Sequence, residues 1–144
     1  MGFADHRIIP YSWITASGVI TMPQLTLEYT DNLEFDVQDV LARLHSELAG
    51  TGAINLKGLK SRAVRHIEYR LADGNPEYAF VHVGLLIREG RPIEVQKDAS
   101  QRVMKVLEDT FGQRFGTGYL SLSVDIKEMR DGIALTHHNI PNKT

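Results

Sequence analysis

Polar and apolar residues alternate strictly from Gln24 to Thr30, which is the pattern of a strand with one buried face. Leu25, Leu27 and Tyr29 fall on one side of this strand, and the polar side chains between them fall on the other. The alternation therefore predicts a half-buried strand that begins directly after Pro23.

The rest of the chain extends this strand into a repeated order of strand, helix and strand. Apolar residues recur every three or four positions after Asp36, and a second apolar set follows Pro92 from Ile93 to Phe111, which predicts two amphipathic helices. Asp36 is a suitable N-cap, and Pro92 a suitable first helical residue because that position needs no backbone N–H. The predicted ranges are a helix over 37–48, a strand over 61–71, a strand over 78–87, a helix from Pro92 to near Gly112, and a strand around 120–126.

This order predicts two pairs of parallel strands, because a helical crossover is needed to join neighbouring strands that run in the same direction. We therefore expect an α+β fold, a duplicated β-α-β unit that forms a four-stranded sheet with two helices packed on one face. The other face of the sheet is expected to carry apolar residues as well. Covering them would require self-association.

Composition narrows the classes of function. The length of 144 residues indicates one domain, with an ordinary hydrophobic content of 42% and a net charge of −2. Because there is no basic run, we expect neither nucleic acid nor a membrane surface as a partner. The chain has no cysteine, which excludes disulfides and thiolate chemistry, and no apolar run of the roughly 18 residues that span a membrane. These features are compatible with the cytoplasm.

Residues 1–22 differ from the remainder and are interpreted as a leader. They show neither a helical period nor alternation, and they lack the charged start and apolar middle of a signal peptide. The leader would arise either from upstream in-frame translation or from a genuine extension. A chain begun at Met22 would lose that methionine by ordinary trimming. Pro23 would then carry a free secondary amine, with an ordinary pKa of about 8 that burial lowers.

Four motifs follow Met22-Pro23 in order along the chain. They are Glu-Tyr-Thr-Asp-Asn (28–32), Leu-Lys-Gly-Leu-Lys-Ser-Arg (56–62), Tyr-Ala-Phe-Val-His (78–82) and Gly-Arg (90–91). With the β-α-β repeat, they resemble the tautomerase superfamily, and most closely the 5-carboxymethyl-2-hydroxymuconate Δ-isomerase family. On this resemblance, residues 23–144 are interpreted as a tautomerase-like isomerase domain. Lys60 departs from the family pattern, which has arginine at that position.

The resemblance implies a cofactor-free isomerase in which the amine of Pro23 is the general base. It also implies an unsaturated hydroxy or keto di- or tricarboxylate as substrate, like 5-carboxymethyl-2-hydroxymuconate of homoprotocatechuate breakdown, and a homotrimer. Arg91 is expected to act with Pro23 in catalysis, and Lys60, Arg62 and Phe80 are expected to bind substrate. Arginine suits this task, since its guanidinium grips a carboxylate through two parallel hydrogen bonds.

Other interpretations of the same residues stay open. Pro23 can be an ordinary proline at the head of a strand, where no ladder donor is needed. Arg91 and Arg62 can be solvated surface cations, and Phe80 can be a plain core aromatic. The same fold could also support a hydratase or a dehalogenase, or serve as a non-catalytic oligomeric binding protein with Pro23 blocked.

The histidines are interpreted as structural. His82 is predicted to be a hydrogen-bonded core histidine on an interior strand. The adjacent His137 and His138 suggest a metal site, but neighbouring side chains on a strand point to opposite faces, and no third ligand stands at a useful spacing. We therefore expect neither a metal nor a cofactor.

Overall fold

The computed structural model describes residues 23–51, 54 and 58–141, and the predicted leader, Gly52, Leu56 and Lys57 lie outside these ranges. The elements are β1 (Gln24–Thr30), α2 (Val37–Ala49), β2 (Lys60–His66), β3 (Tyr78–Arg88), α3 (Ile93–Phe111), the short 3-10 helix η2 (Gly112–Gly116) and β4 (Tyr119–Met129). Within the described ranges, no helix combines the length and the apolar character that crossing a membrane requires.

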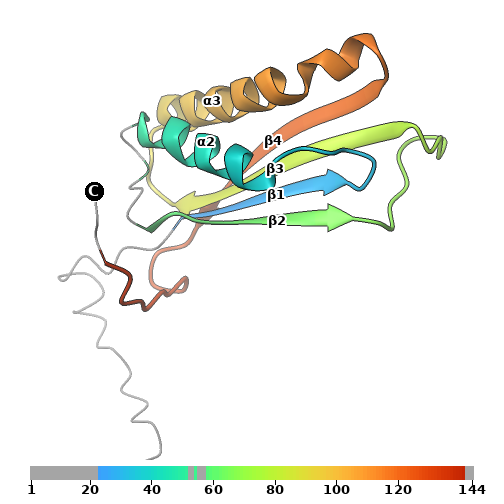
Figure 1. Ribbon diagram of the computed structural model, residues 1–144. Helices are drawn as coiled ribbons and strands as arrows, with labels where there is room; N and C mark the ends of the chain where they lie inside the picture. Colours follow the sequence, from blue (N-terminus) through green and yellow to red (C-terminus); the bar gives the residue numbers. More distant parts are fainter. Residues whose placement is uncertain (1–22, 52–53, 55–57, 142–144) are drawn as a thin grey trace, which may run out of the picture.

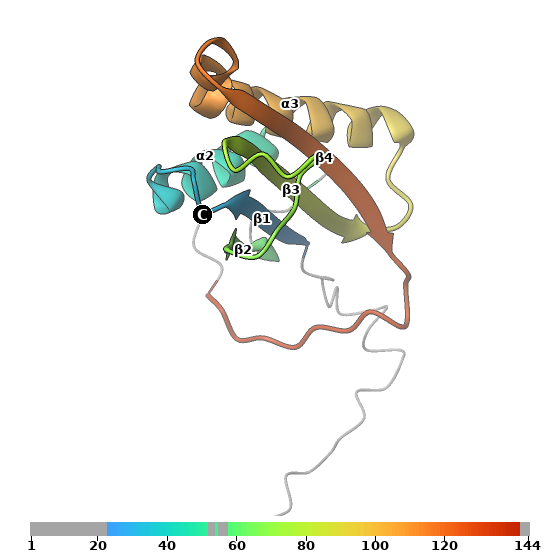
Figure 2. The same cartoon turned by 90° about the vertical axis from the view of Figure 1, so that its right-hand side faces the viewer.

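The four strands form one sheet in the order β2-β1-β3-β4. β1 runs parallel to β2, β3 runs parallel to β4, and the two pairs meet where β1 runs antiparallel to β3. Figures 1 and 2 show α2 and α3 side by side on one face of this sheet. The predicted α+β fold, a duplicated β-α-β unit with both helices on one face, is confirmed.

The core lies between the two helices and the sheet face that they cover. Its most buried members, each 1% exposed or less, include Leu25, Leu27, Leu44, Leu48, Val81, Val83, Leu85, Val103 and Leu107. Burial of one such side chain contributes about 1.5–3 kcal/mol. This packing holds the strands, and with them the residues at the strand ends, in fixed positions.

The helix starts follow the capping residues. α2 begins at Val37 as predicted, and the Asp36 carboxylate accepts a hydrogen bond from the Asp39 backbone N–H at 3.0 Å. α3 begins one residue later than predicted, because Pro92 takes an extended N-cap conformation. Before it, Gly90 has a φ of 94°, a left-handed conformation that glycine adopts without strain. Gly90 thus allows the chain to turn sharply between β3 and α3.

β2 is shorter than predicted. The alternating side chains suggested a strand that continues to residue 71, but β2 ends at His66. His66 pairs with Thr30, the last residue of β1, and a turn at Asp31 follows on that strand. A strand continues only while a neighbour takes its backbone hydrogen bonds, so the residues after His66 leave the sheet although their side chains still alternate.

The open face of the sheet combines polar side chains with the apolar side chains that were expected there. Its members form rows across the strands, namely Lys60–Gln24–Leu86–Lys127, Arg62–Thr26–Gly84–Asp125 and Val64–Glu28–His82–Ser123. Val64 and Leu86 are the apolar side chains within these rows, and Phe80, Tyr78 and Tyr119 lie on the same face beyond them.

Candidate active site

Three of the predicted site residues gather at one end of the sheet. The carbonyl of Pro23, directly before β1, accepts a hydrogen bond from the Lys60 backbone N–H at 3.1 Å, which joins the starts of β1 and β2. Because β3 is antiparallel to β1, Gln24 pairs with Leu86 near the end of β3. The turn that carries Arg91 follows this strand end (Figure 1). Pro23, Lys60 and Arg91 therefore lie at the same end.

Pro23 is buried at the start of β1. Strand alternation places its ring on the helix-covered side, with Leu25, and places Gln24 on the open face. The chemistry available to Pro23 depends on its nitrogen. Linked to Met22 the nitrogen is an amide without basicity, whereas a free nitrogen is a secondary amine whose charged form burial disfavours.

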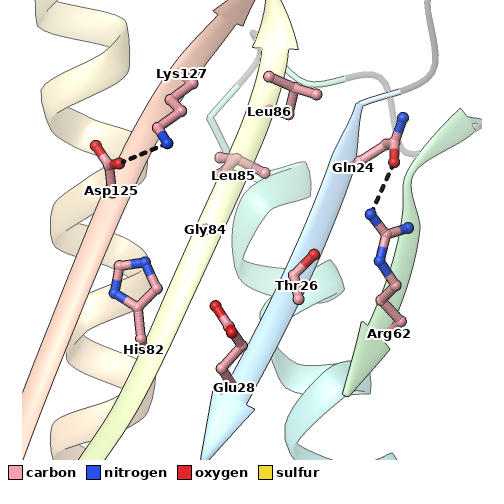
Figure 3. Close-up of a pocket in the computed structure, with 10 residues that line it drawn as sticks. All are labelled: Gln24, Thr26, Glu28, Arg62, His82, Gly84, Leu85, Leu86, Asp125 and Lys127. Atoms are coloured by element: carbon pink, nitrogen blue, oxygen red, sulfur yellow. Dashed lines mark hydrogen bonds and ion pairs between the residues drawn. The ribbon is translucent and has the colours of Figure 1, made fainter. Parts of the chain in front are cut away.

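Arg62 stands on the open face of β2, and the side chain of Gln24 holds its guanidinium. Nη2 of Arg62 donates a hydrogen bond to Oε1 of Gln24 at 3.0 Å (Figure 3). The contact is diagonal, because the register partner of Arg62 is Thr26 rather than Gln24. The guanidinium is thereby drawn along the sheet toward the end where Pro23 lies.

A hollow of about 430 Å³ lies on the open face beside this pair. Gly84 lies between Thr26 and Asp125 in a cross-strand row, and its missing side chain leaves space above the sheet (Figure 3). The hollow has lining residues from all four strands, so it is a feature of the sheet rather than of one loop. Its charged lining residues are Glu28, Arg62, Asp125 and Lys127.

The two carboxylates that line the hollow each have a basic partner, whereas Arg62 has a neutral one. The Glu28 carboxylate lies 3.0 Å from Nε2 of His66, and the Asp125 carboxylate lies 3.8 Å from Nζ of Lys127. Arg62, in contrast, is bonded to the neutral amide of Gln24. Among the residues that the structure describes, no carboxylate pairs with Arg62, so this corner of the hollow can attract an anion.

Arg91 and Lys60 add exposed cations at the same end of the sheet. The carbonyl of Arg91 accepts a hydrogen bond from Nε2 of Gln96 at 3.0 Å, which ties the turn to the first part of α3. The backbone N–H of Gly90 donates to the Glu128 carboxylate at 3.1 Å, which ties the turn to β4. The position of the Arg91 backbone is therefore fixed from two sides.

Phe80 lies at the opposite end of the sheet from Pro23. Its backbone N–H donates to Oγ1 of Thr30, the last residue of β1, at 3.1 Å. Its ring packs against His66 and Tyr69, with ring centroids 5.9 and 6.1 Å apart. Thr30 is seven residues after Pro23, so at about 3.4 Å per residue along β1 Phe80 lies roughly 24 Å from Pro23. Within one chain the structure does not bring Phe80 to the other predicted site residues.

The histidines near the site have hydrogen-bond partners. Nδ1 of His82 lies 2.7 Å from Oγ of Ser123, which confirms the predicted hydrogen bond, but His82 is half-buried on the open face and lines the hollow, so it is not a core residue. On α2, Nε2 of His45 lies 2.7 Å from Oγ of Ser61, the residue before Arg62, and burial lowers the pKa of His45 below its ordinary value. Across the described ranges, no cluster of three or more His, Asp or Glu side chains could hold a metal ion.

Gln24 is one of the residues lining this site that sequence reasoning did not single out. Alternation placed it on the polar side of the first strand, and its position directly after Pro23 was the available signal. Its partner Arg62 is 38 positions away in the chain. The contact depends on the register between β1 and β2, which the pattern of either strand alone does not contain.

Known proteins resemble this chain in both sequence and fold. A family model described as 5-carboxymethyl-2-hydroxymuconate isomerase matches residues 23–144. The 5-carboxymethyl-2-hydroxymuconate Delta-isomerase of Escherichia coli is 30% identical over 121 residues, which cover 83% of this chain and 96% of that protein.

Solved structures give the same result. A 5-carboxymethyl-2-hydroxymuconate isomerase from Deinococcus radiodurans R1 is 36% identical with a TM-score of 0.79, and the match covers 85% of this chain and 95% of that one. A fused 4-OT symmetric trimer, 11% identical with a TM-score of 0.61 over 74% of this chain and 85% of that one, shares the fold. The chain therefore belongs to the 5-carboxymethyl-2-hydroxymuconate isomerase family, within the tautomerase superfamily, and is an isomerase of that kind.

Proposed function

We propose that this isomerase moves a double bond in an unsaturated hydroxy di- or tricarboxylate, with the free amine of Pro23 as general base. Two relatives, at 30% and 36% identity, are named for 5-carboxymethyl-2-hydroxymuconate, and we propose a substrate of this class. The observation that carries the proposal is the gathering of Lys60, Arg62 and Arg91 toward the sheet end where Pro23 lies.

The reaction is a proton transfer within one molecule. The Pro23 amine would accept the proton of the 2-hydroxyl group, and the electrons of that O–H bond would form the carbonyl as the conjugated double bonds shift. The resulting ammonium would return a proton to a distant carbon, so the product is an isomer and the amine is regenerated. A base whose pKa lies near the working pH can perform both steps. The balance of atoms and electrons requires no cofactor.

The cations at this end would stabilise the negative charge that develops as the proton leaves. Arg62 would hold one carboxylate on the open face. Arg91, just before α3, would hold another where the helix N-terminus also favours anions. Lys60 would add positive charge without the two-pronged geometry of arginine. The substrate would thus lie across the sheet end, with its reacting carbons at Pro23.

The experiment that tests the proposal uses protein begun at Met22, with its N-terminus verified by mass spectrometry. Isomerisation of 5-carboxymethyl-2-hydroxymuconate is followed by its ultraviolet absorbance. Pro23→Ala should lower kcat/KM by about 100-fold, at the lower end of general-base effects because a primary amine remains. Pro141→Ala, an exposed proline, should leave activity unchanged. Undiminished activity in Pro23→Ala would refute the base.

We also propose that three chains assemble into the working enzyme. β2 and β4 are the edge strands of the described sheet, and open edges favour pairing with another chain. The exposed apolar side chains Phe115, Tyr119, Ile133 and Leu135 would be covered in such an assembly. Light scattering should give three times the mass of a single chain. A mass of one chain at assay concentrations would contradict the trimer.

A further inference from the structure

We infer that Gln24 and Arg62 form one carboxylate clamp, in which Gln24 both orients the guanidinium and donates its own amide N–H groups to the bound anion. The inference rests on the proposed function, because the clamp would hold a carboxylate of the substrate whose proton Pro23 removes. It assigns Gln24 a part in substrate binding that depends on the geometry of two neighbouring strands.

The orientation of the Gln24 amide follows from the chemistry of its partner. A guanidinium donates hydrogen bonds and accepts none, so the atom of Gln24 that lies 3.0 Å from Nη2 of Arg62 is the carbonyl oxygen. The amide nitrogen of Gln24 then points away from Arg62, as Figure 3 shows. Its two N–H groups are available to a ligand that lies against the pair.

The charge of this pair favours an anion. Glu28, the nearest acidic residue on the same face of β1, is bonded at 3.0 Å to His66, which lies toward the opposite end of the sheet. Gln24 therefore meets Arg62 with no competing carboxylate from β1. A bound carboxylate would gain a charge-assisted hydrogen bond from the guanidinium and a second bond from the amide.

The position of the clamp suits a substrate with separated carboxylates. Gln24 directly follows Pro23, and its register partner Lys60 brings a further cation beside it. The hollow above Gly84 provides room on the open face next to the pair. A carboxylate held here would be a short carbon chain away from atoms that react at Pro23, which selects for di- and tricarboxylates over acids with one carboxylate.

Binding without turnover provides the test. The full 144-residue chain, labelled with ¹⁵N, is titrated with adipate, a saturated dicarboxylate that cannot be isomerised, and followed by NMR. The side-chain NH₂ signals of Gln24 and the Nε–H signal of Arg62 should shift together with one dissociation constant. A shift of Arg62 alone, or the absence of saturable binding, would overturn the clamp.

Gln24→Glu, with Gln101→Glu as its control, tests whether the amide of Gln24 donates to the bound anion. Gln24→Glu keeps an acceptor for Arg62 but replaces the donors with a negative charge, so adipate affinity should fall at least tenfold. Gln101→Glu adds the same charge at an exposed position on α3 and should leave the affinity unchanged. Adipate that binds Gln24→Glu as tightly as the parent protein would contradict the inference.

The kinetic readout distinguishes a binding role from a structural one. Gln24→Leu should raise KM for a dicarboxylate substrate about tenfold while kcat changes less than twofold, whereas a general disturbance of the strand would lower kcat. A loss confined to kcat would count against the clamp. If Pro23→Ala keeps full activity, the proposal that Pro23 is the general base is refuted. The adipate titration would still test the clamp independently. A failed titration alongside an inactive Pro23→Ala variant would refute the clamp alone.

Discussion

Replacing Arg62 with methionine removes the guanidinium and keeps an unbranched stem. Loss of a hydrogen bond to a charged group costs about 1.5–3 kcal/mol. Arg62 is exposed, so water screens its charge and the lower part of this range applies, about 1.5–2 kcal/mol. At 1.36 kcal/mol for each factor of ten, KM for a dicarboxylate substrate should rise about 10- to 30-fold. The free energy of unfolding should change by less than about 0.5 kcal/mol, as is usual for a surface position.

The assay is the initial rate of dienol isomerisation in protein begun at Met22, measured over a range of substrate concentrations. Arg65→Met is the matched control, because Arg65 lies on the same strand but on the other face, where its Nη2 donates to the Asp31 carbonyl at 3.4 Å. This control should leave KM within twofold. Equal increases in KM for Arg62→Met and Arg65→Met, or no increase in either, would refute the reasoning.

Three further predictions concern the scaffold and are measured by urea unfolding. Thr30 is fully buried, and its Oγ1 contacts Oδ1 of Asn32 at 2.7 Å and the Phe80 N–H at 3.1 Å, so Thr30→Val should cost about 2 kcal/mol. A cost below about 0.5 kcal/mol would contradict this account. Asp36→Ala should remove about 1 kcal/mol with the α2 cap, and no change would show that the cap is dispensable. Burial lowers the pKa of His45 below its ordinary value of 6.5, so on acidification the unfolded chain takes up a proton before the folded one. The contribution of His45 to the free energy of unfolding is therefore fully present above about pH 6.5, and it is lost as the pH falls through the lowered pKa. His45→Gln should reduce this pH dependence, and an unaltered dependence would argue against it.

Elements that are decided by neighbouring residues were predictable from the sequence. Alternation in β1 reflects the burial of one strand face, and the three- and four-residue spacing in α2 reflects the burial of one helix face. Asp36 caps α2 through a contact only three residues away. Each of these features depends on residues only a few positions apart in the chain. The sequence pattern therefore records the burial or the hydrogen bond that causes it.

Features that depend on pairing between distant strands were not predictable in this way. β2 ends at His66 because β1 offers no further partner after Thr30, although the β2 side chains continue to alternate. Phe80 lies far from Pro23 because β3 runs antiparallel to β1, and a sequence motif does not give the direction of its strand. The contact of Gln24 with Arg62 likewise requires the register of two strands.

The central claim is that the Pro23 nitrogen is a free amine in the active enzyme. Inserting one alanine between Met22 and Pro23 tests it most directly, because trimming of Met22 then leaves Ala-Pro, with the ring unchanged and its nitrogen an amide. With both N-termini verified by mass spectrometry and both proteins equally resistant to urea, we predict at least a 100-fold loss of isomerase activity in the extended form, within the range of general-base effects. Equal activity in the two forms would contradict the account.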